Sequence, residues 1–109
     1  NIQSINDFQK KIDKKIEIRR FRGNICVDGI KPWVEREWIG KVIKVNNIPF
    51  KVEKNIPRCV AINLKPTTDD NSLNLLQSLK KAYDHFEMGI YLTALDDGEI
   101  NLSDKLDVN

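Results

Sequence analysis

The chain has 109 residues, of which 40% are hydrophobic and 31% charged, and its formal net charge at neutral pH is +2. This length and composition are typical of one soluble globular domain, which we assign to residues 1–109, with a modest core. The small net charge does not favour a nucleic-acid partner, and no apolar run approaches the roughly 20 residues of a membrane span.

The charges are unevenly distributed along the chain. Residues 1–22 carry more basic than acidic side chains, and residues 67–109 carry more acidic than basic ones. The basic part could face an anion such as a phosphate, or it could be an ordinary solvated helix face, and the sequence leaves both interpretations open.

Two cysteines, Cys26 and Cys59, are too few for a disulfide framework, and neither lies in a C-x-x-C motif. We therefore expect a reducing, cytoplasmic location, with a single Cys26–Cys59 bridge left open. With only one histidine besides, a structural zinc site made of protein ligands is not expected. No signal-peptide pattern opens the chain, and Asn1 in place of Met suggests part of a longer protein.

The first predicted element is a short amphipathic helix over residues 4–14. Ile5, Phe8 and Ile12 recur at helical spacing with lysines between them. The tetrapeptide that starts at Ser4 resembles a capping box, which predicts Ser4 as the N-cap.

Residues 24–28 are predicted to form a buried strand, which makes Cys26 a core residue. Three arginines precede it, and Arg22 is closest to a Gly-Asn loop, where a backbone without Cβ lets a ligand approach closely. Trp33 and Trp38 follow. They could stack on a ligand, although capping one end of a barrel is the more usual role of such side chains.

A β-hairpin is predicted next, with strands over residues 41–45 and 48–54. Asn46 and Asn47 stand between them, and asparagine tolerates the left-handed conformation that tight hairpin turns need. Apolar and charged residues alternate in the second strand, which predicts one buried face.

The stretch Pro57-Arg58-Cys59 places a thiol where a loop leads into an apolar run, which predicts a buried strand over residues 59–64. The Arg58 guanidinium is always charged and favours the thiolate form of its neighbour. A thiolate can attack a sulfur or carbonyl centre, carry a persulfide or bind a soft transition metal. From the dipeptide alone, a small buried side chain is the simpler interpretation.

Ser72 is predicted to cap a helix with a leucine-rich face, and the single histidine, His85, is expected to be solvated just after it. Strands are predicted over residues 89–95 and 99–102, and residues 105–108 close the chain. Short strands separated by turns predict a mainly β, α+β domain. We expect a small antiparallel barrel with two helices packed on it.

The order of these features resembles the MOSC domain, the C-terminal domain of molybdenum cofactor sulfurases, shared with the mitochondrial amidoxime-reducing component. The resemblance is carried by Arg-Phe-Arg-x-Asn at residues 20–24, Pro-Arg-Cys at 57–59, Gly-x-Tyr at 89–91 and Gly-Glu-Ile at 98–100. It covers nearly the whole chain and implies a MOSC-type β-barrel that binds the molybdenum cofactor, a molybdopterin.

The resemblance also implies a set of site residues. Cys59 matches the family's functional cysteine, which coordinates molybdenum in cofactor-binding members and is thought to receive sulfur in sulfurases. Arg58 matches the arginine before it, so both are expected to be catalytic. Arg22 and Asn24 match residues implicated in holding the pterin and its phosphate. Tyr91 matches a tyrosine that lines the same site.

Two functions are expected from the resemblance. The first is a cofactor-binding domain of an oxidoreductase that reduces N-oxygenated compounds with an external electron donor. The second is a sulfur carrier that holds a persulfide on Cys59, taken from a sulfur donor. A binding-only barrel with a core cysteine is the third alternative. Relatives that bind the cofactor carry an N-terminal β-barrel domain, and sulfurases a pyridoxal-phosphate domain, which 109 residues cannot contain.

Two positions depart from the family pattern. Gly23 stands where the family usually has proline, which loosens the loop between Arg22 and Asn24. Lys65 stands where the family often has aspartate, which reverses a charge near the expected site.

Overall fold

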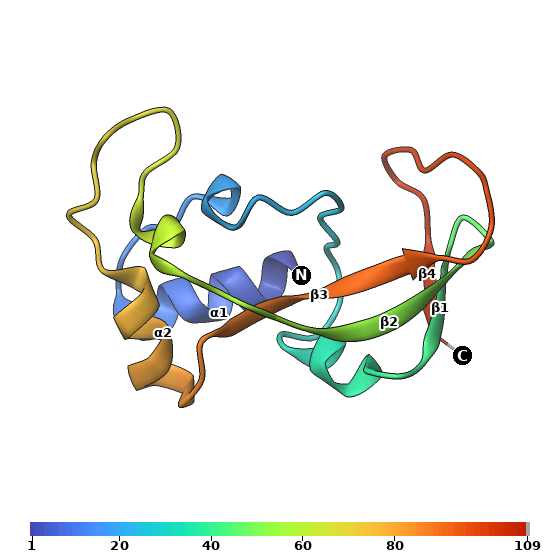
Figure 1. Cartoon of the computed structure of the whole chain (residues 1–109), viewed down its shortest axis with the longest axis horizontal. Coiled ribbons are helices and arrows are strands. Elements are labelled where there is room, and N and C mark those ends of the chain that lie inside the picture. The colour runs from blue at the N-terminus through green and yellow to red at the C-terminus, as the bar shows by residue number, and fades with distance from the viewer. Residues whose placement is uncertain (109) are drawn as a thin grey trace.

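The computed structural model describes residues 1–108, which form two α-helices, three short 3-10 helices and a four-stranded antiparallel sheet (Figure 1). The helices are α1 (Ile2–Ile12), η1 (Ile18–Phe21), η2 (Val34–Trp38), η3 (Val60–Asn63) and α2 (Leu75–Tyr83). The strands are β1 (Val42–Val45), β2 (Ile48–Pro57), β3 (Glu87–Ala94) and β4 (Leu106–Val108). The predicted α+β class is confirmed.

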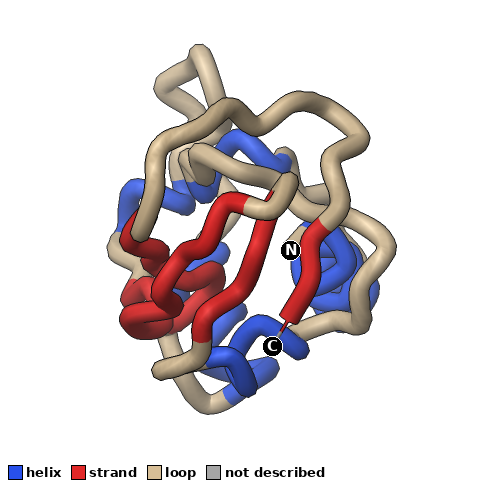
Figure 2. The backbone as a smooth tube through the Cα atoms, turned by 90° about the vertical axis from the view of Figure 1, so that its right-hand side faces the viewer, coloured by secondary structure: helices blue, strands red, loops and turns tan. Residues whose placement is uncertain are grey.

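The sheet has the order β3-β2-β1-β4, so β3 and β4 are its edges. Viewed from the side in Figure 2, the strands form one layer, and the connection between β3 and β4 passes across the end of the sheet. Because the two edge strands do not pair with each other, the sheet of residues 1–108 is open, and the predicted closure into a barrel is not observed.

The predicted hairpin is confirmed. β1 and β2 are joined by Asn46 and Asn47, whose φ angles are 50° and 63°. Both residues therefore adopt the left-handed conformation that a two-residue hairpin turn requires. The alternation predicted for β2 is also confirmed, since Phe50 and Val52 are buried on the same face.

Two separate apolar clusters form the core. The first lies at the helical end and contains Ile5, Phe8, Ile16, Phe21, Ile62, Leu75, Leu79 and Met88. The second lies on the sheet and contains Trp38, Ile43, Val45, Ile48, Phe50 and Val52. The molecule measures 41 × 28 × 22 Å and has a radius of gyration of 14.5 Å, against about 13 Å for a compact chain of this length. The domain is therefore elongated, with a core at each end.

The strands predicted over residues 24–28, 59–64 and 99–102 are wrong. The first and last are loops, and the second contains η3. The apolar run that follows β2 joins neither edge strand of the sheet, β3 or β4. The run instead turns back at η3, which leaves Val60 70% exposed. Cys26, predicted to be in the core, is exposed.

α1 begins two residues before the predicted start, because its N-cap is Asn1 and not Ser4. The Asn1 side chain accepts a hydrogen bond from the backbone N–H of Gln3 at 3.0 Å. Ser4 is fully buried one turn into the helix, and its hydroxyl donates to Glu35 at 2.8 Å. Ser4 therefore joins α1 to η2.

α2 also begins later than predicted, with Asn74 and not Ser72 as its N-cap. His85 follows the helix as predicted, but it is half-buried rather than solvated. Its ring stacks on Tyr83, its Nδ1 accepts a hydrogen bond from the backbone N–H of Glu87 at 3.0 Å, and burial lowers its pKa. Neither α-helix within residues 1–108 combines the length and apolar character needed to cross a bilayer.

A polar network centred on Asp7 connects the helical elements. Its carboxylate accepts hydrogen bonds from the Tyr83 hydroxyl at 2.6 Å and from Trp33 Nε1 at 2.9 Å. The Trp33 and Tyr83 rings pack with their centroids 4.4 Å apart. Trp33 therefore packs within the domain, as does the buried Trp38 of the second cluster. The hydrogen bonds from Tyr83 and Trp33 lower the pKa of Asp7, and burial raises the pKa of Tyr83.

We predict that Asp7→Ala lowers the free energy of unfolding by about 1–2 kcal/mol at neutral pH, because two partly buried donors lose their acceptor. Asp69, which is exposed and makes no side-chain hydrogen bond within residues 1–108, supplies the matched control Asp69→Ala.

The pKa of Asp7 is lower in the folded than in the unfolded state, so its contribution is complete above about pH 4 and is lost as the pH falls through the folded value. Urea denaturation of wild type and variant should therefore converge in acid. A difference that persists unchanged at low pH would contradict this role.

Candidate functional site

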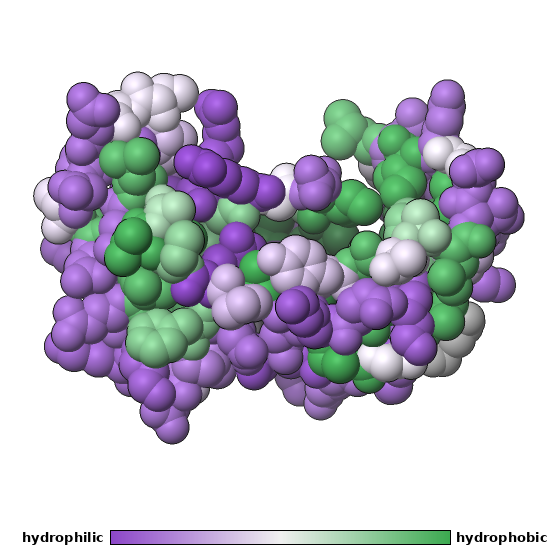
Figure 3. Space-filling view, viewed as in Figure 1, coloured by the Kyte–Doolittle hydropathy of each residue, from purple (hydrophilic) through white to green (hydrophobic). Residues whose placement is uncertain are grey.

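A cleft of about 480 Å³ lies between the two apolar clusters, and side chains from both line it. Figure 3 shows the corresponding hollow across the middle of the molecule, with hydrophobic residues in its interior. Four of the five predicted site residues line this cleft: Arg22, Asn24, Arg58 and Tyr91. Cys59 does not line it.

Arg58 lines the cleft and joins three segments of the chain. It follows the last residue of β2, and its backbone N–H donates to the carbonyl of Phe86 at 2.7 Å. Its side chain then turns inward, where Nε donates to the Met88 carbonyl at 2.9 Å and Nη1 to the Phe21 carbonyl at 2.7 Å. The guanidinium carbon also lies 5.4 Å from the centroid of the Phe21 ring. Arg58 thus binds β3 and η1 to the end of β2.

This position is possible because β3 has a glycine beneath the guanidinium. Gly89 has a φ of +86°, and a Cβ at this position would lie 3.2 Å from Arg58 Nη2. Burial lowers the pKa of Arg58, and the nearby Tyr91 and Cys59 oppose this effect. Nη2 of the guanidinium makes no hydrogen bond within residues 1–108, so both of its N–H groups can serve a ligand.

Cys59 is exposed at the junction of β2 and η3, where it is the N-cap residue of η3. Its carbonyl accepts a hydrogen bond from the backbone N–H of Ile62 at 3.2 Å. The hydrogen bonds of the Arg58 side chain go to backbone carbonyls and not to the Cys59 thiol. The Arg58 side chain therefore binds backbone carbonyls within the domain, whereas the adjacent Cys59 thiol is exposed to solvent.

The remaining predicted residues lie on the mouth of the cleft. Arg22 is the C-cap of η1 with a φ of 51°, and its exposed side chain has no hydrogen-bond partner within residues 1–108. Asn24 follows in an exposed loop. Tyr91, on β3, is 46% exposed, and its ring centroid is 5.4 Å from Lys54 Nζ. Residues from three segments distant in sequence thus meet at one cleft.

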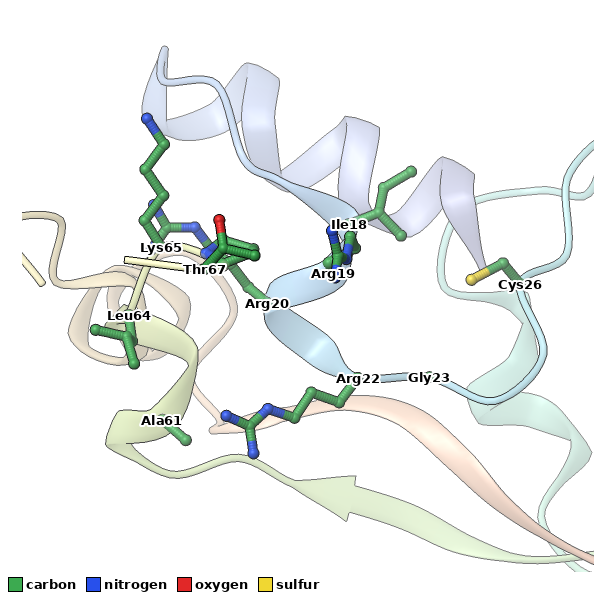
Figure 4. Close-up of a pocket in the computed structure, with 11 residues that line it drawn as sticks. Ile18, Arg19, Arg20, Arg22, Gly23, Cys26, Ala61, Leu64, Lys65 and Thr67 are labelled. Atoms are coloured by element: carbon green, nitrogen blue, oxygen red, sulfur yellow. The ribbon is translucent and has the colours of Figure 1, made fainter. Parts of the chain in front are cut away.

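A second cavity, of about 430 Å³, lies between η1 and the loop after η3 (Figure 4). Four basic side chains line it: Arg19, Arg20, Arg22 and Lys65. Cys26 lines both cavities. The sequence reasoning missed Cys26, because the apolar residues on both sides of it suggested a buried strand. The dense arginines before it were the available signal for the basic cavity.

No group of three or more His, Cys, Asp or Glu side chains suited to metal binding occurs within residues 1–108. A metal bound in this part of the chain would therefore need some of its ligands from a molecule other than these side chains. A thiolate combined with sulfur ligands from a cofactor is one such arrangement.

A family model described as the MOSC domain matches residues 1–107. The chain is 33% identical over 86 residues to a molybdenum cofactor sulfurase of Bombyx mori, which covers 78% of this chain and 10% of that protein. It is 32% identical over 97 residues to a molybdenum cofactor sulfurase of Drosophila willistoni, covering 86% of this chain and 12% of that protein. It is also 31% identical over 65 residues to mitochondrial amidoxime reducing component 2 of Bos taurus, and this match covers 60% of this chain and 19% of that protein. The chain thus spans only about a tenth to a fifth of the length of the curated relatives that it matches.

We predict that Gly89→Ala lowers the free energy of unfolding by about 1–2 kcal/mol, because a side chain is strained at positive φ and the new Cβ crowds the Arg58 guanidinium. Gly23→Ala is the matched control, since the nearest atom to its added Cβ is 3.9 Å away. Urea denaturation measures both. Equal effects of the two substitutions would show that Gly89 has no special role.

Proposed function

The chain belongs to the MOSC domain family, and we propose that it is the molybdenum-cofactor-binding domain of a larger oxidoreductase. The observation that supports this best is the meeting of Arg22, Asn24, Arg58 and Tyr91 at one cleft. They come from the residue after η1, the loop that follows it, the residue after β2 and the middle of β3, so folding brings together residues that are distant in sequence.

The cleft fits the organic part of such a cofactor. Its volume of about 480 Å³ and its mainly apolar lining, with a few polar groups, are typical of sites for small organic molecules. The Asn24 amide and the Tyr91 hydroxyl would serve the hydrogen-bonding edge of the pterin. The unpaired guanidinium of Arg22 would hold its phosphate. When bound, the molybdenum centre supplies the redox chemistry, while these residues orient it.

Ligation of molybdenum by Cys59 is a separable part of the proposal. A thiolate is a suitable ligand for this soft centre, and Cys59 directly follows Arg58, which lines the cleft. The thiol itself does not line the cleft. Pterin binding in the cleft and metal binding by Cys59 can therefore succeed or fail independently.

The substrate class and partners are extended from the relatives. A relative named as an amidoxime reducing component supports N-oxygenated compounds as substrates. Since the chain spans only about a tenth to a fifth of its relatives, we propose that a further, N-terminal β-barrel domain completes the pocket. Electrons would come from a donor outside this domain, because the two cysteines of the domain cannot hold an iron–sulfur cluster of the four-cysteine type.

A second candidate function is a sulfur carrier, favoured by the exposure of Cys59 and by the relatives named as molybdenum cofactor sulfurases. The Cys59 thiolate would attack the outer sulfur of a persulfide on a donor protein, and the donor thiolate would leave. The Cys59 persulfide would then pass that sulfur to an acceptor and regain its thiolate. An exposed thiol can meet both partners.

We predict that the full-length protein, including the proposed N-terminal domain, contains pterin and molybdenum when it is purified from a molybdenum-replete host. Arg22→Ala and Asn24→Ala should each lower pterin occupancy about tenfold, equivalent to about 1.4 kcal/mol, with unchanged circular dichroism because both side chains are exposed. Asn71→Ala, an exposed asparagine outside the cleft, is the control. Equal occupancy in all three variants would refute the cleft as the cofactor site.

We further predict that Cys59→Ser removes molybdenum but leaves pterin if Cys59 is a metal ligand. If it is a sulfur carrier, Cys26→Ser protein treated with a persulfide donor should gain the mass of one sulfur atom, which a thiol reductant removes. Cys59→Ser protein should gain no such mass. Because both thiols are exposed, the two variants are matched. Loss of neither metal nor sulfur loading in Cys59→Ser would exclude both roles for Cys59.

A further inference from the structure

We propose that the smaller cavity, between η1 and the loop after η3, is a binding site for a tetrahedral oxyanion of the phosphate or sulfate class. Its distinguishing side chains, Arg19, Lys65 and Thr67, do not line the larger cleft. Arg22, proposed above to hold the cofactor's phosphate, lines both cavities, but the other cations of this cavity do not line the cleft. The proposal therefore goes beyond the cofactor site and would stand if the cleft held no cofactor.

The lining of this cavity has an excess of positive charge. Arg19, Arg20, Arg22 and Lys65 line it, and no Asp or Glu within residues 1–108 does. The side chains of Arg19, Arg22 and Lys65 make no ion pair or hydrogen bond within the same residues. Their donors are therefore available to an anion. Figure 4 shows the arginines of η1 on one side of the cavity and the residues after η3 on the other.

Arg20 has a different role, since it fixes the two walls of the cavity. It is 7% exposed, and its Nε donates to Glu17 Oε1 at 2.6 Å. Its Nη1 donates to the carbonyls of Ile62 at 3.3 Å and of Asn63 at 2.9 Å. These hydrogen bonds join η1 to η3, so the separation between the free cations on the two walls is set by a buried side chain.

Two carboxylates lie near Lys65, and both already have partners. Glu17 accepts a hydrogen bond from Arg20, which lowers the pKa of Glu17. Asp70 accepts hydrogen bonds from the backbone N–H and hydroxyl of Ser72, which lower the pKa of Asp70. Four cations against these two anions leave the cavity positively charged.

The loop after η3 holds Thr67 in a strained conformation at the cavity. Its φ is 63°, which is unusual for a β-branched residue. The loop is fixed by hydrogen bonds from the Lys65 backbone N–H to the Asp70 carbonyl at 2.8 Å and from the Thr68 hydroxyl to the Lys65 carbonyl at 3.0 Å. Strain of this kind persists where the surrounding structure holds it, often beside a ligand. The Thr67 hydroxyl adds a neutral donor to the cationic ones.

These donors specify the chemistry of the ligand. A guanidinium presents a planar fork of N–H groups that suits oxyanions, and the exposed walls leave the ligand in contact with water. The two cavities share Ile18, Arg22, Gly23 and Cys26 in their linings. The oxyanion can therefore be a free ion or the phosphoryl group of a larger ligand whose apolar part lies in the cleft.

The proposal is tested with purified protein by following ³¹P line broadening and thermal unfolding during titration with inorganic phosphate, at ionic strength held constant with chloride. We expect saturable binding that sulfate displaces. Arg19→Gln with Lys65→Gln should weaken it about tenfold or more, the effect of losing two charged donors. Lys44→Gln is the control, since Lys44 is an exposed lysine on β1 that lines neither cavity.

Phenyl phosphate distinguishes the two sources of the oxyanion. If it binds more tightly than inorganic phosphate, the group belongs to a larger ligand that enters the cleft, and equal binding indicates a free oxyanion. Phosphate binding that is unsaturable, or unchanged in the double variant, would overturn the proposal. Because pterin content is measured separately, an intact cofactor site in the double variant would show which of the two proposals had failed.

Discussion

The guanidinium of Arg58 is the constraint on which the geometry around the cleft depends. Through two side-chain hydrogen bonds and one from its backbone, it joins the end of β2 to β3 and to η1. A half-buried charge must have hydrogen-bond partners to be tolerated, and these partners are backbone carbonyls rather than a carboxylate. The charge is therefore solvated by the protein but not neutralised. The segment carrying Arg22 and Asn24 is thereby held beside β3 in a region of positive charge.

The cleft exists because the chain does not bring its two apolar clusters together. Helices α1 and α2 build one around Phe8 and Leu79, and the sheet builds the other around Ile43 and Val52. β3 and β2 connect them along the length of the molecule (Figure 1). Apolar surface is left in the hollow between the clusters, and an apolar ligand or a further segment that covers it would gain roughly 25 cal/mol for each Å² removed from water.

Much of this fold could be predicted from local signals. The hairpin around Asn46 and Asn47 was predicted because its turn requires residues that tolerate positive φ, and α2 because its leucines follow a helical period. The strands predicted over residues 24–28 and 59–64 are not observed, and the two predictions were wrong for a common reason. A short apolar run has no period that distinguishes a strand from another segment, and whether it pairs depends on which sheet edges are open. Neither run pairs with the free edge of β3 or β4, and nothing within the runs themselves indicates this.

The site, like the fold, has features that sequence motifs indicate and others that depend on the surrounding structure. The resemblance to the MOSC domain implied that Arg22, Asn24, Arg58 and Tyr91 share one site, and all four line one cleft. Their role in binding a cofactor stays a prediction. The resemblance could not place Cys59, since the direction of a side chain at a strand end depends on the turn that follows. With η3 turning the chain there, the guanidinium of Arg58 faces inward and the adjacent thiol faces solvent. The cleft proposed for an organic ligand and the Cys59 thiol therefore lie on different surfaces, so each proposal can be tested without the other.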